Sequence, residues 1–362
     1  MKVKFNVTVA LASVFGASVM MGFAHADTAW EEVVAAAERE GKVTIIGPPV
    51  QPHRDTIMGF EEAYPNIRVE YTGMAPPQFE ARLNAERGAG RYLWDILISG
   101  MSSTVYERQI PQGWFDPLRP VVVLPEVLDD ENWVGGFEAG FLDEKGKYIY
   151  AFSAERSGNV GFDTNRVDAD SFSYETLLDP RWRGQIAMLD PRGRGPGSVA
   201  FRQIVVALGE DGAKKLLKEQ DVVLAESPRQ VTEWAVRGTY PITVGLTLTD
   251  LTIFQGRGIG ENIAIYEDPQ GFLLTKWGNV ALMNGAPNPN ASKVFVNWLL
   301  TREAQKQWSS TGYVNSRRMD VPLAHPALKV DVDTWESGYN ISGAKTAADG
   351  VKALRIAEEG LR

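Results

Sequence analysis

Short apolar runs alternate with amphipathic segments near the start of the chain, in a pattern that few folds can accommodate. A short apolar run typical of a buried strand lies at 43–46, and the segments at 67–71 and 96–98 are predicted as the next two strands. Between them, the segments around 57–64 and 78–87 have the apolar spacing of a helix. Strands separated by single helices form parallel sheets with right-handed crossovers. The sequence therefore predicts an α/β fold in which the carboxyl ends of these strands meet at one edge of a sheet, where ligands bind.

The first 26 residues have the pattern of a cleavable signal peptide. Lys2 and Lys4 precede an apolar stretch over 7–23, and the small residues at 24–26 provide a cleavage site. We therefore predict cleavage after residue 26 and a periplasmic location. The chain contains no cysteine, so it carries neither disulfides nor the acylated cysteine that anchors a lipoprotein. No later run reaches the ~18 apolar residues of a membrane span, and we expect no stable membrane insertion after cleavage.

The charge balance limits the partners that the chain can have. The 362 residues include 37 basic and 46 acidic side chains, with a formal net charge of −9. An acidic surface without a run of lysines and arginines repels nucleic acid, so no nucleic-acid partner is expected. The length suffices for two domains, and we predict a monomer.

Two polar interruptions of strand-like stretches, at 153–158 and at 267–271, predict crossings between two lobes. Two crossings make the first lobe discontinuous in sequence, and the ligand cleft is expected between the lobes because pockets favour domain interfaces. The predicted boundaries are 27–155 with 270–320 for the first lobe, and 156–269 with the C-terminal segment 321–362 for the second.

Two stretches of the sequence carry a resemblance to known proteins: SYETLLDPRWRGQIAM at 173–188 and NGAPNPNA at 284–291. The first is similar to the "dLLdPrWkGkia" segment, and the second to another segment, of the iron(III)-type family of extracellular solute-binding proteins. The family typically has a histidine where Asn288 stands, so this position departs from its pattern. The resemblance implies a two-lobed periplasmic-binding-protein fold of type II that closes on a small ligand and then docks on the transmembrane permease subunits of an ABC importer, without catalysis or a cofactor.

The absence of tyrosines from one region of the second lobe argues against ferric ion as the ligand. Ferric members of the family bind the ion with second-lobe tyrosines, often an adjacent pair, because phenolate oxygens suit a hard trivalent cation. The corresponding region, 245–254, contains no tyrosine, and the chain has no adjacent tyrosine pair. We therefore expect a small organic ligand, an anion such as a phosphate ester, a phosphonate or a carboxylate. Ferric ion remains an alternative, as does a polyamine held by Asp250, Glu267 and Asp268.

The loop at 190–198, between a predicted strand and a predicted helix, is the first candidate anion site. Arg192 or Arg194 would bind a carboxylate or phosphate in a bidentate manner, and Gly197 and Ser198 begin a helix whose N-terminus favours negative charge. The alternative interpretation is a glycine-rich surface turn with two solvated arginines.

Further candidate ligand contacts lie at other strand ends and at the crossings. Some have a structural alternative: the serines as helix N-caps, the arginine as a hinge ion pair, and the tryptophan as part of a core. These candidates are Pro48, Ser99, Gly100, Ser102, Ser103, Arg156, Thr247, Thr249 and Trp277.

The sequence lacks the usual signatures of an enzyme. It has no G-x-S-x-G motif, and after signal cleavage His53 and His325 are its only histidines. Without cysteine, a zinc site or a cysteine–histidine pair is not expected. A secreted hydrolase is the remaining alternative, because the separation of two catalytic carboxylates is a property of the fold and not of the sequence.

Overall fold

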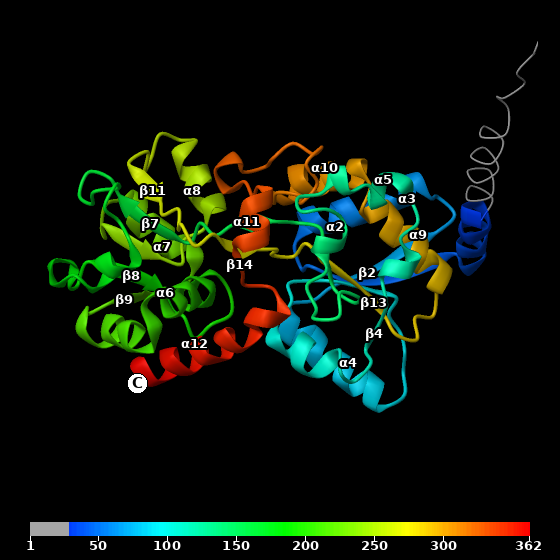
Figure 1. The fold of residues 1–362 in the computed structure, drawn as a ribbon, viewed down its shortest axis with the longest axis horizontal. Helices are drawn as coiled ribbons and strands as arrows, with labels where there is room; N and C mark the ends of the chain where they lie inside the picture. Colours follow the sequence, from blue (N-terminus) through cyan, green and yellow to red (C-terminus); the bar gives the residue numbers. More distant parts are fainter. Residues whose placement is uncertain (1–28) are drawn as a thin grey trace, which may run out of the picture.

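Two α/β lobes joined by a narrow waist make up the described part of the chain (Figure 1). The computed structural model describes residues 29–362, so the predicted signal peptide and its cleavage site lie outside the described residues. Within 29–362, no helix combines the length and the apolar character needed to cross a membrane. The predicted two-lobed α/β architecture is confirmed.

The sheet of the first lobe has the strand order β2-β1-β3-β13-β4, with β5 paired to β13. Its strands are β1 (Lys42–Gly47), β2 (Arg68–Gly73), β3 (Ile96–Ile98), β4 (Phe115–Asp116), β5 (Tyr150–Ala151) and β13 (Asn279–Met283). β1 runs parallel to both β2 and β3, as predicted for strands that are separated by single helices. β13 is antiparallel to β3, so the chain leaves this lobe after β5 and later returns to the middle of its sheet.

Helices cover this sheet because its strands bury both sides, with Ile45 in one core cluster and Ile46 in another. The helices are the segment over 29–40, α2 (Gln51–Met58), α3 (Phe60–Ala63), α4 (Pro76–Gly88), α5 (Pro125–Leu128), α9 (Pro289–Leu299) and α10 (Arg302–Gly312). The single helix expected around 57–64 is divided into α2 and α3 at Gly59. A β-carbon at Gly59 would lie 2.9 Å from the Gln307 side chain of α10, so the junction permits close packing of the helices.

The second lobe has its own sheet and its own core. The sheet has the order β11-β7-β10-β8-β9, in which β8 is parallel to β9 and β10, and β7 is antiparallel to β10 and β11. Its elements are β7 (Val160–Asp163), β8 (Ile186–Leu189), α6 (Pro196–Glu219), β9 (Val223–Ala225), α7 (Pro228–Val236), β10 (Ile242–Val244), α8 (Leu248–Gln255) and β11 (Ile263–Ile265). The helix predicted to begin at Gly197 and Ser198 is the first part of α6, which bends at Gly209 (φ +70°).

The waist contains a small sheet of three strands in the order β14-β12-β6. Its strands are β6 (Glu155–Arg156), β12 (Phe272–Leu274) and β14 (Tyr339–Asn340). β6 and β12 are antiparallel to each other. β6 lies in the first predicted crossing between the lobes, and β12 directly follows the second. β14 lies parallel to β12 and carries the chain across a third time. The predicted boundaries, which place 321–362 with the second lobe, imply a third crossing but did not assign a strand to it.

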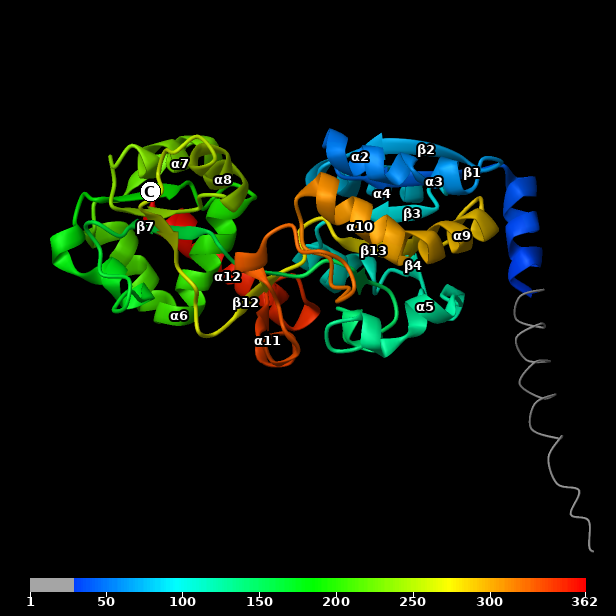
Figure 2. The ribbon, with the colours of Figure 1, turned by 90° about the horizontal axis from the view of Figure 1, so that it is seen from above.

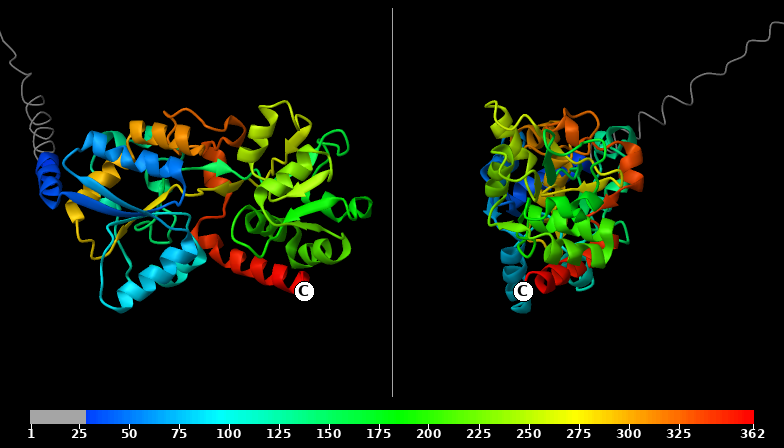
Figure 3. Two further views of the ribbon diagram at one scale, coloured as in Figure 1. Left: turned by 180° about the vertical axis from the view of Figure 1, so that it is seen from behind. Right: turned by 90° about the vertical axis from the view of Figure 1, so that its left-hand side faces the viewer.

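The C-terminal segment 321–362 does not accompany the second lobe as one piece, contrary to our expectation. α11 (Val332–Ser337) packs against the first lobe, where Trp335 Nε1 donates to the Ala139 carbonyl at 3.3 Å. α12 (Ala347–Gly360) instead lies along α6, and Ile356 and Ala357 join the core of the second lobe (Figure 3). The segment divides because Trp335 and the apolar stripe of α12 are buried by different cores.

Arg317 ties the C-terminal part of the first lobe to its sheet. Its side chain has no exposed surface and makes five hydrogen bonds: to the carbonyls of Ala151, Val134, Gly136 and Phe137, and to the Tyr150 hydroxyl, at 2.6–3.2 Å. The guanidinium also lies 4.9 Å from the ring centroid of Trp133. A buried charge is tolerated here because neutral oxygens and aromatic faces replace its hydration.

We expect Arg317→Lys to lower the free energy of unfolding by about 3 kcal/mol, because an ammonium group cannot reach five acceptors and leaves buried carbonyls unpaired. Urea unfolding followed by tryptophan fluorescence measures the loss. The matched control is Arg302→Lys, whose guanidinium is 46% exposed and whose substitution should cost less than about 0.5 kcal/mol. Equal losses in the two variants would contradict this account of Arg317.

His53 of α2 is buried in an apolar setting. Its ring is edge-on to Trp308 at 4.4 Å between centroids, and neither ring nitrogen has a hydrogen-bond partner. Burial, with a smaller contribution from the charge of Lys276, lowers the pKa of His53 to about 4. Unfolded histidine has a pKa of about 6.5. Between these two values the unfolded state binds more protons, so the stability from neutral His53 is complete above pH 6.5 and is lost as the pH falls toward 4.

The protein should therefore lose about 2 kcal/mol of unfolding free energy through His53 between pH 7.5 and pH 5. The variant His53→Phe keeps an aromatic ring beside Trp308 and removes the titration. Denaturant unfolding of both proteins at the two pH values isolates the effect, because all other titrating groups are shared. If the variant loses as much stability as the wild type, His53 is not the group responsible.

Candidate functional site

The strand ends of the first lobe face the second lobe. β1 starts beside the helix over 29–40, at the far end of the molecule, and runs toward the waist (Figure 2). The loops that follow β1 and β3, which contain Pro48 and residues 99–104, therefore lie at the edge nearest the second lobe. In the second lobe the corresponding loops follow β8 and β10. This is the edge-to-edge arrangement that the two-lobed prediction required.

One ion pair in the described structure connects these edges directly. Arg194 Nη2, in the loop after β8, lies 3.7 Å from Glu80 Oε2 of α4. Ser102, in the loop after β3, donates its hydroxyl hydrogen to the other Glu80 oxygen at 2.9 Å. The Glu80 side chain is 12% exposed, whereas that of Arg194 is 54% exposed. Two predicted residues, Arg194 and Ser102, thus meet through Glu80, which the sequence analysis missed.

The two arginines of the 190–198 loop have different surroundings. Arg192 folds back onto Asp190 of its own lobe, with Nε and Nη2 at 2.9 and 2.6 Å from the carboxylate oxygens. This pairing holds the pKa of Asp190 below its usual value. Arg194 instead reaches the opposite lobe. A carboxylate two residues before Arg192 was the available sequence signal that these arginines are not equivalent.

Gly197 and Ser198 begin α6 in a tightly packed corner. A β-carbon at Gly197 would lie 2.6 Å from the Leu189 carbonyl oxygen. Ser198 Oγ donates to the Gly195 carbonyl at 2.9 Å and accepts from the Gly195 amide at 3.2 Å. Gly195 itself has φ +133°, a conformation that favours glycine. These contacts bring the N-terminus of α6 close to the end of β8, beside Arg194.

Ser99 and Gly100 lie against the turn that precedes β13. The Asn279 side chain donates to the Ser99 carbonyl at 2.8 Å, and a β-carbon at Gly100 would lie 3.1 Å from the Lys276 carbonyl oxygen. Lys276 has a positive φ of 46° and forms an ion pair with Glu155, which has no exposed surface. The ion pair between Lys276 and Glu155 could not be predicted from the sequence, because the two residues belong to different crossings.

The other predicted contacts are dispersed. The Pro48 carbonyl accepts a hydrogen bond from the Tyr71 hydroxyl, and Ser103 is half-buried in the loop after β3. Thr247 caps α8 by accepting from the Asp250 amide at 3.2 Å, and Thr249 is exposed in the first turn of this helix.

Arg156 and Trp277 lie near the waist. Arg156 is on β6 and borders a small hollow with Asp268 and Leu328. Trp277 is half-buried against the main core of the first lobe. The structural alternative considered for Trp277, a core residue, describes the contacts that it makes.

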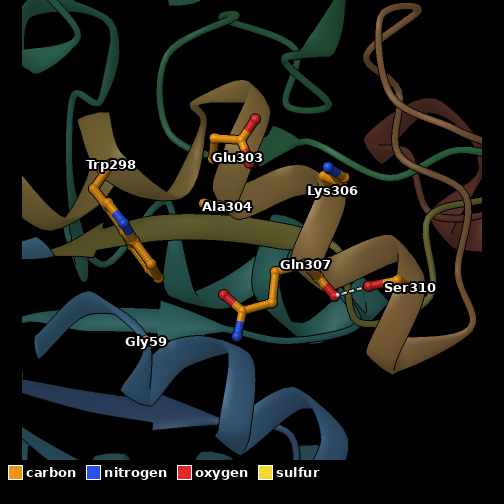
Figure 4. Close-up of a pocket in the computed structure, with 7 residues that line it drawn as sticks. All are labelled: Gly59, Trp298, Glu303, Ala304, Lys306, Gln307 and Ser310. Atoms are coloured by element: carbon orange, nitrogen blue, oxygen red, sulfur yellow. Dashed lines mark hydrogen bonds between the residues drawn. The ribbon is translucent and has the colours of Figure 1, made fainter. Parts of the chain in front are cut away.

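A separate hollow of about 300 Å³ lies on the first lobe (Figure 4). It is bordered by Gly59 between α2 and α3, Trp298 of α9, and Glu303, Ala304, Lys306, Gln307 and Ser310 of α10. All of these residues belong to one lobe, so this hollow is not the site between the strand ends. Among residues 29–362, no group of three or more histidine, cysteine, aspartate or glutamate side chains is arranged to hold a metal ion.

Sequence comparisons relate the middle of the chain to a known family. Residues 150–314 match the family of bacterial extracellular solute-binding proteins, and this span contains both segments that carry the resemblance described above. A curated relative, an uncharacterized protein of Haemophilus influenzae, is 28% identical over 172 residues, 45% of this chain and 48% of the relative. The chain thus spans about half the length of that relative.

Solved structures with a similar fold cover most of the chain. A Trichodesmium protein in complex with iron and citrate has a TM-score of 0.67 and 14% identity over 88% of this chain and 99% of its own. The ferric binding protein of Campylobacter jejuni has a TM-score of 0.66 and 19% identity over 88% and 99%. The periplasmic binding protein AfuA of Actinobacillus pleuropneumoniae, with fructose-6-phosphate bound, has a TM-score of 0.58 and 17% identity over 88% and 97%.

At these identities the similar structures establish the fold of the chain. The match over 150–314 covers somewhat less than half of the chain, and together with the shared two-lobed fold it supports the resemblance to extracellular solute-binding proteins found in the sequence.

Proposed function

We propose that the chain is the periplasmic solute-binding component of an ABC importer, and that it captures a small organic anion between its lobes without catalysis. The observation that carries this proposal is the position of Arg194. Its guanidinium belongs to the second lobe, lies 3.7 Å from a side chain of the first lobe, and is 54% exposed. A cation in this position is available to a ligand and close to both lobes.

Neighbouring groups support an anionic ligand. The N-terminus of α6 begins two residues after Arg194, and unpaired amides together with the helix dipole attract negative charge there. Hydroxyl groups of Ser102 and Ser103 lie in the facing loop of the first lobe. Among proteins of similar fold, one is described with fructose-6-phosphate bound and another with iron and citrate. Phosphate esters and carboxylates are therefore the first ligands to test.

The alternatives have less support. Ferric ion would need hard oxygen donors, yet the region 245–254 contains threonines in place of tyrosines, and Thr247 is engaged in capping α8. A polyamine would need free carboxylates, yet Asp250 accepts a hydrogen bond from the Thr247 hydroxyl at 2.7 Å. Glu267 and Asp268 border the hollow at the waist and not the strand ends near Arg194.

Ligand capture would work by closure of the lobes about the waist. A ligand that contacts both edges stabilises the closed arrangement over the open one, and this difference in contacts selects the closed form. We propose that β6 and β12 act as the hinge, since both are short strands and both join the lobes. The closed form would then dock as a monomer on the permease subunits.

Replacement of Arg194 by alanine should weaken binding of the anion by about 10- to 100-fold, the loss of one charge-assisted hydrogen-bonded contact. Arg192→Ala is the matched control, because Arg192 is two residues away and pairs with Asp190 of its own lobe. Isothermal titration calorimetry of both variants gives the comparison. Equal affinities in Arg194→Ala and the wild type would contradict the proposed site.

A thermal-shift screen identifies the ligand class. Phosphorylated sugars, phosphonates, citrate, ferric citrate and spermidine are tested, and an anion at 100 times its dissociation constant should stabilise the protein by about 2.7 kcal/mol. Stabilisation by ferric ion without an organic anion, or by spermidine alone, would favour the corresponding alternative. Formation of product from a phosphate ester would instead favour a hydrolase.

A further inference from the structure

Glu80 holds a carboxylate in a confined position between the lobes. Its side chain is 12% exposed, although it extends toward Arg194 of the opposite lobe. Ser102 fixes one of its oxygens by a hydrogen bond of 2.9 Å within the first lobe. The other oxygen faces Arg194 at 3.7 Å, beyond the 2.7–2.9 Å that is typical of a charge-assisted hydrogen bond. The pair therefore neutralises Glu80 without giving Arg194 a close partner.

A bound anion would change the partners of both residues. Phosphate and carboxylate groups form short bidentate contacts with a guanidinium, so such a group competes well against an ion pair of 3.7 Å. Glu80 cannot turn away easily, because Ser102 and the packing of α4 hold it in place. Once Arg194 has moved to the ligand, a mostly buried carboxylate is left with one hydrogen-bond donor. Leaving such a group unpaired is costly.

We propose that Glu80 determines specificity by requiring a hydrogen-bond donor on the ligand next to its anionic group. This inference rests on the proposed function and names the ligand class more closely. Arg194 takes the anionic group, and a hydroxyl group of the ligand donates to the Glu80 oxygen that Arg194 has left. The ligand is therefore a hydroxylated anion, such as a hydroxylated phosphate ester or a hydroxycarboxylate. An anion without hydroxyl groups is disfavoured, because Glu80 repels it and gains no donor.

Pairs of anions that differ only in hydroxyl groups test this requirement. Suitable pairs are citrate with tricarballylate, glycerol 3-phosphate with propyl phosphate, and sorbitol 6-phosphate with hexyl phosphate. Calorimetry measures both members with the wild type, with Glu80→Gln and with Glu107→Gln. Glu107 is an exposed residue of the same lobe, so its variant controls for the change of net charge.

For any pair that binds, the wild type and Glu107→Gln should prefer the hydroxylated member by at least about 10-fold, the value of one hydrogen bond to a charged group. In Glu80→Gln the preference should shrink several-fold, chiefly because the anion without hydroxyl groups binds more tightly. Equal binding of the two members by the wild type, or an unchanged preference in Glu80→Gln, would overturn the role of Glu80 alone. Failure of every anion to bind the wild type would overturn the proposed function and this inference together.

Discussion

Glu155 is an acidic side chain without exposed surface, and the geometry of the waist follows from the need to neutralise it. Lys276 supplies the opposite charge, and the Asn315 amide donates to the second carboxylate oxygen at 2.8 Å. These partners come from the second crossing and from the end of the first lobe, so one carboxylate joins three distant segments. A buried ion pair is retained only when its geometry is good, because losing either partner leaves an unpaired charge. The left-handed backbone at Lys276 (φ +46°) is consistent with that requirement.

The sequence predicted those features that depend on local pattern. β1 and β3 lie where short apolar runs indicated them, because both strands are buried and so carry little polar sequence. β2 is an edge strand in which only Val69 is buried, and its sequence is correspondingly mixed. The C-terminal segment was harder to assign. Trp335 and the apolar stripe of α12 are each typical of a buried element, but nothing local states which of two cores buries them. Most members of both cores are distant from this segment in sequence, so the assignment depends on the complete fold.

The candidate site also combines features that the local sequence predicts with features that depend on the fold. The sequence predicted that Gly197 and Ser198 begin a helix. The structure shows that glycine is needed at 197 because a β-carbon there would lie too close to the Leu189 carbonyl oxygen. The different surroundings of Arg192 and Arg194 could have been anticipated from Asp190, which is close in sequence. The contact between Arg194 and Glu80 could not have been anticipated from the sequence, because the two residues lie in different lobes and their contact depends on how the lobes are placed.

The third strand of the waist has a mechanical consequence. β14 lies beside β12, which lies beside β6, so the lobes are joined by a ribbon of hydrogen-bonded strands and not by two independent linkers. α6 connects the end of β14 to the second lobe, because its Arg202 donates to the carbonyl of Ile341, the residue after β14, at 3.0 Å. Because hydrogen bonds connect the three strands, the strands should bend together when the lobes move. The relative motion of the lobes should therefore be a rotation about this ribbon.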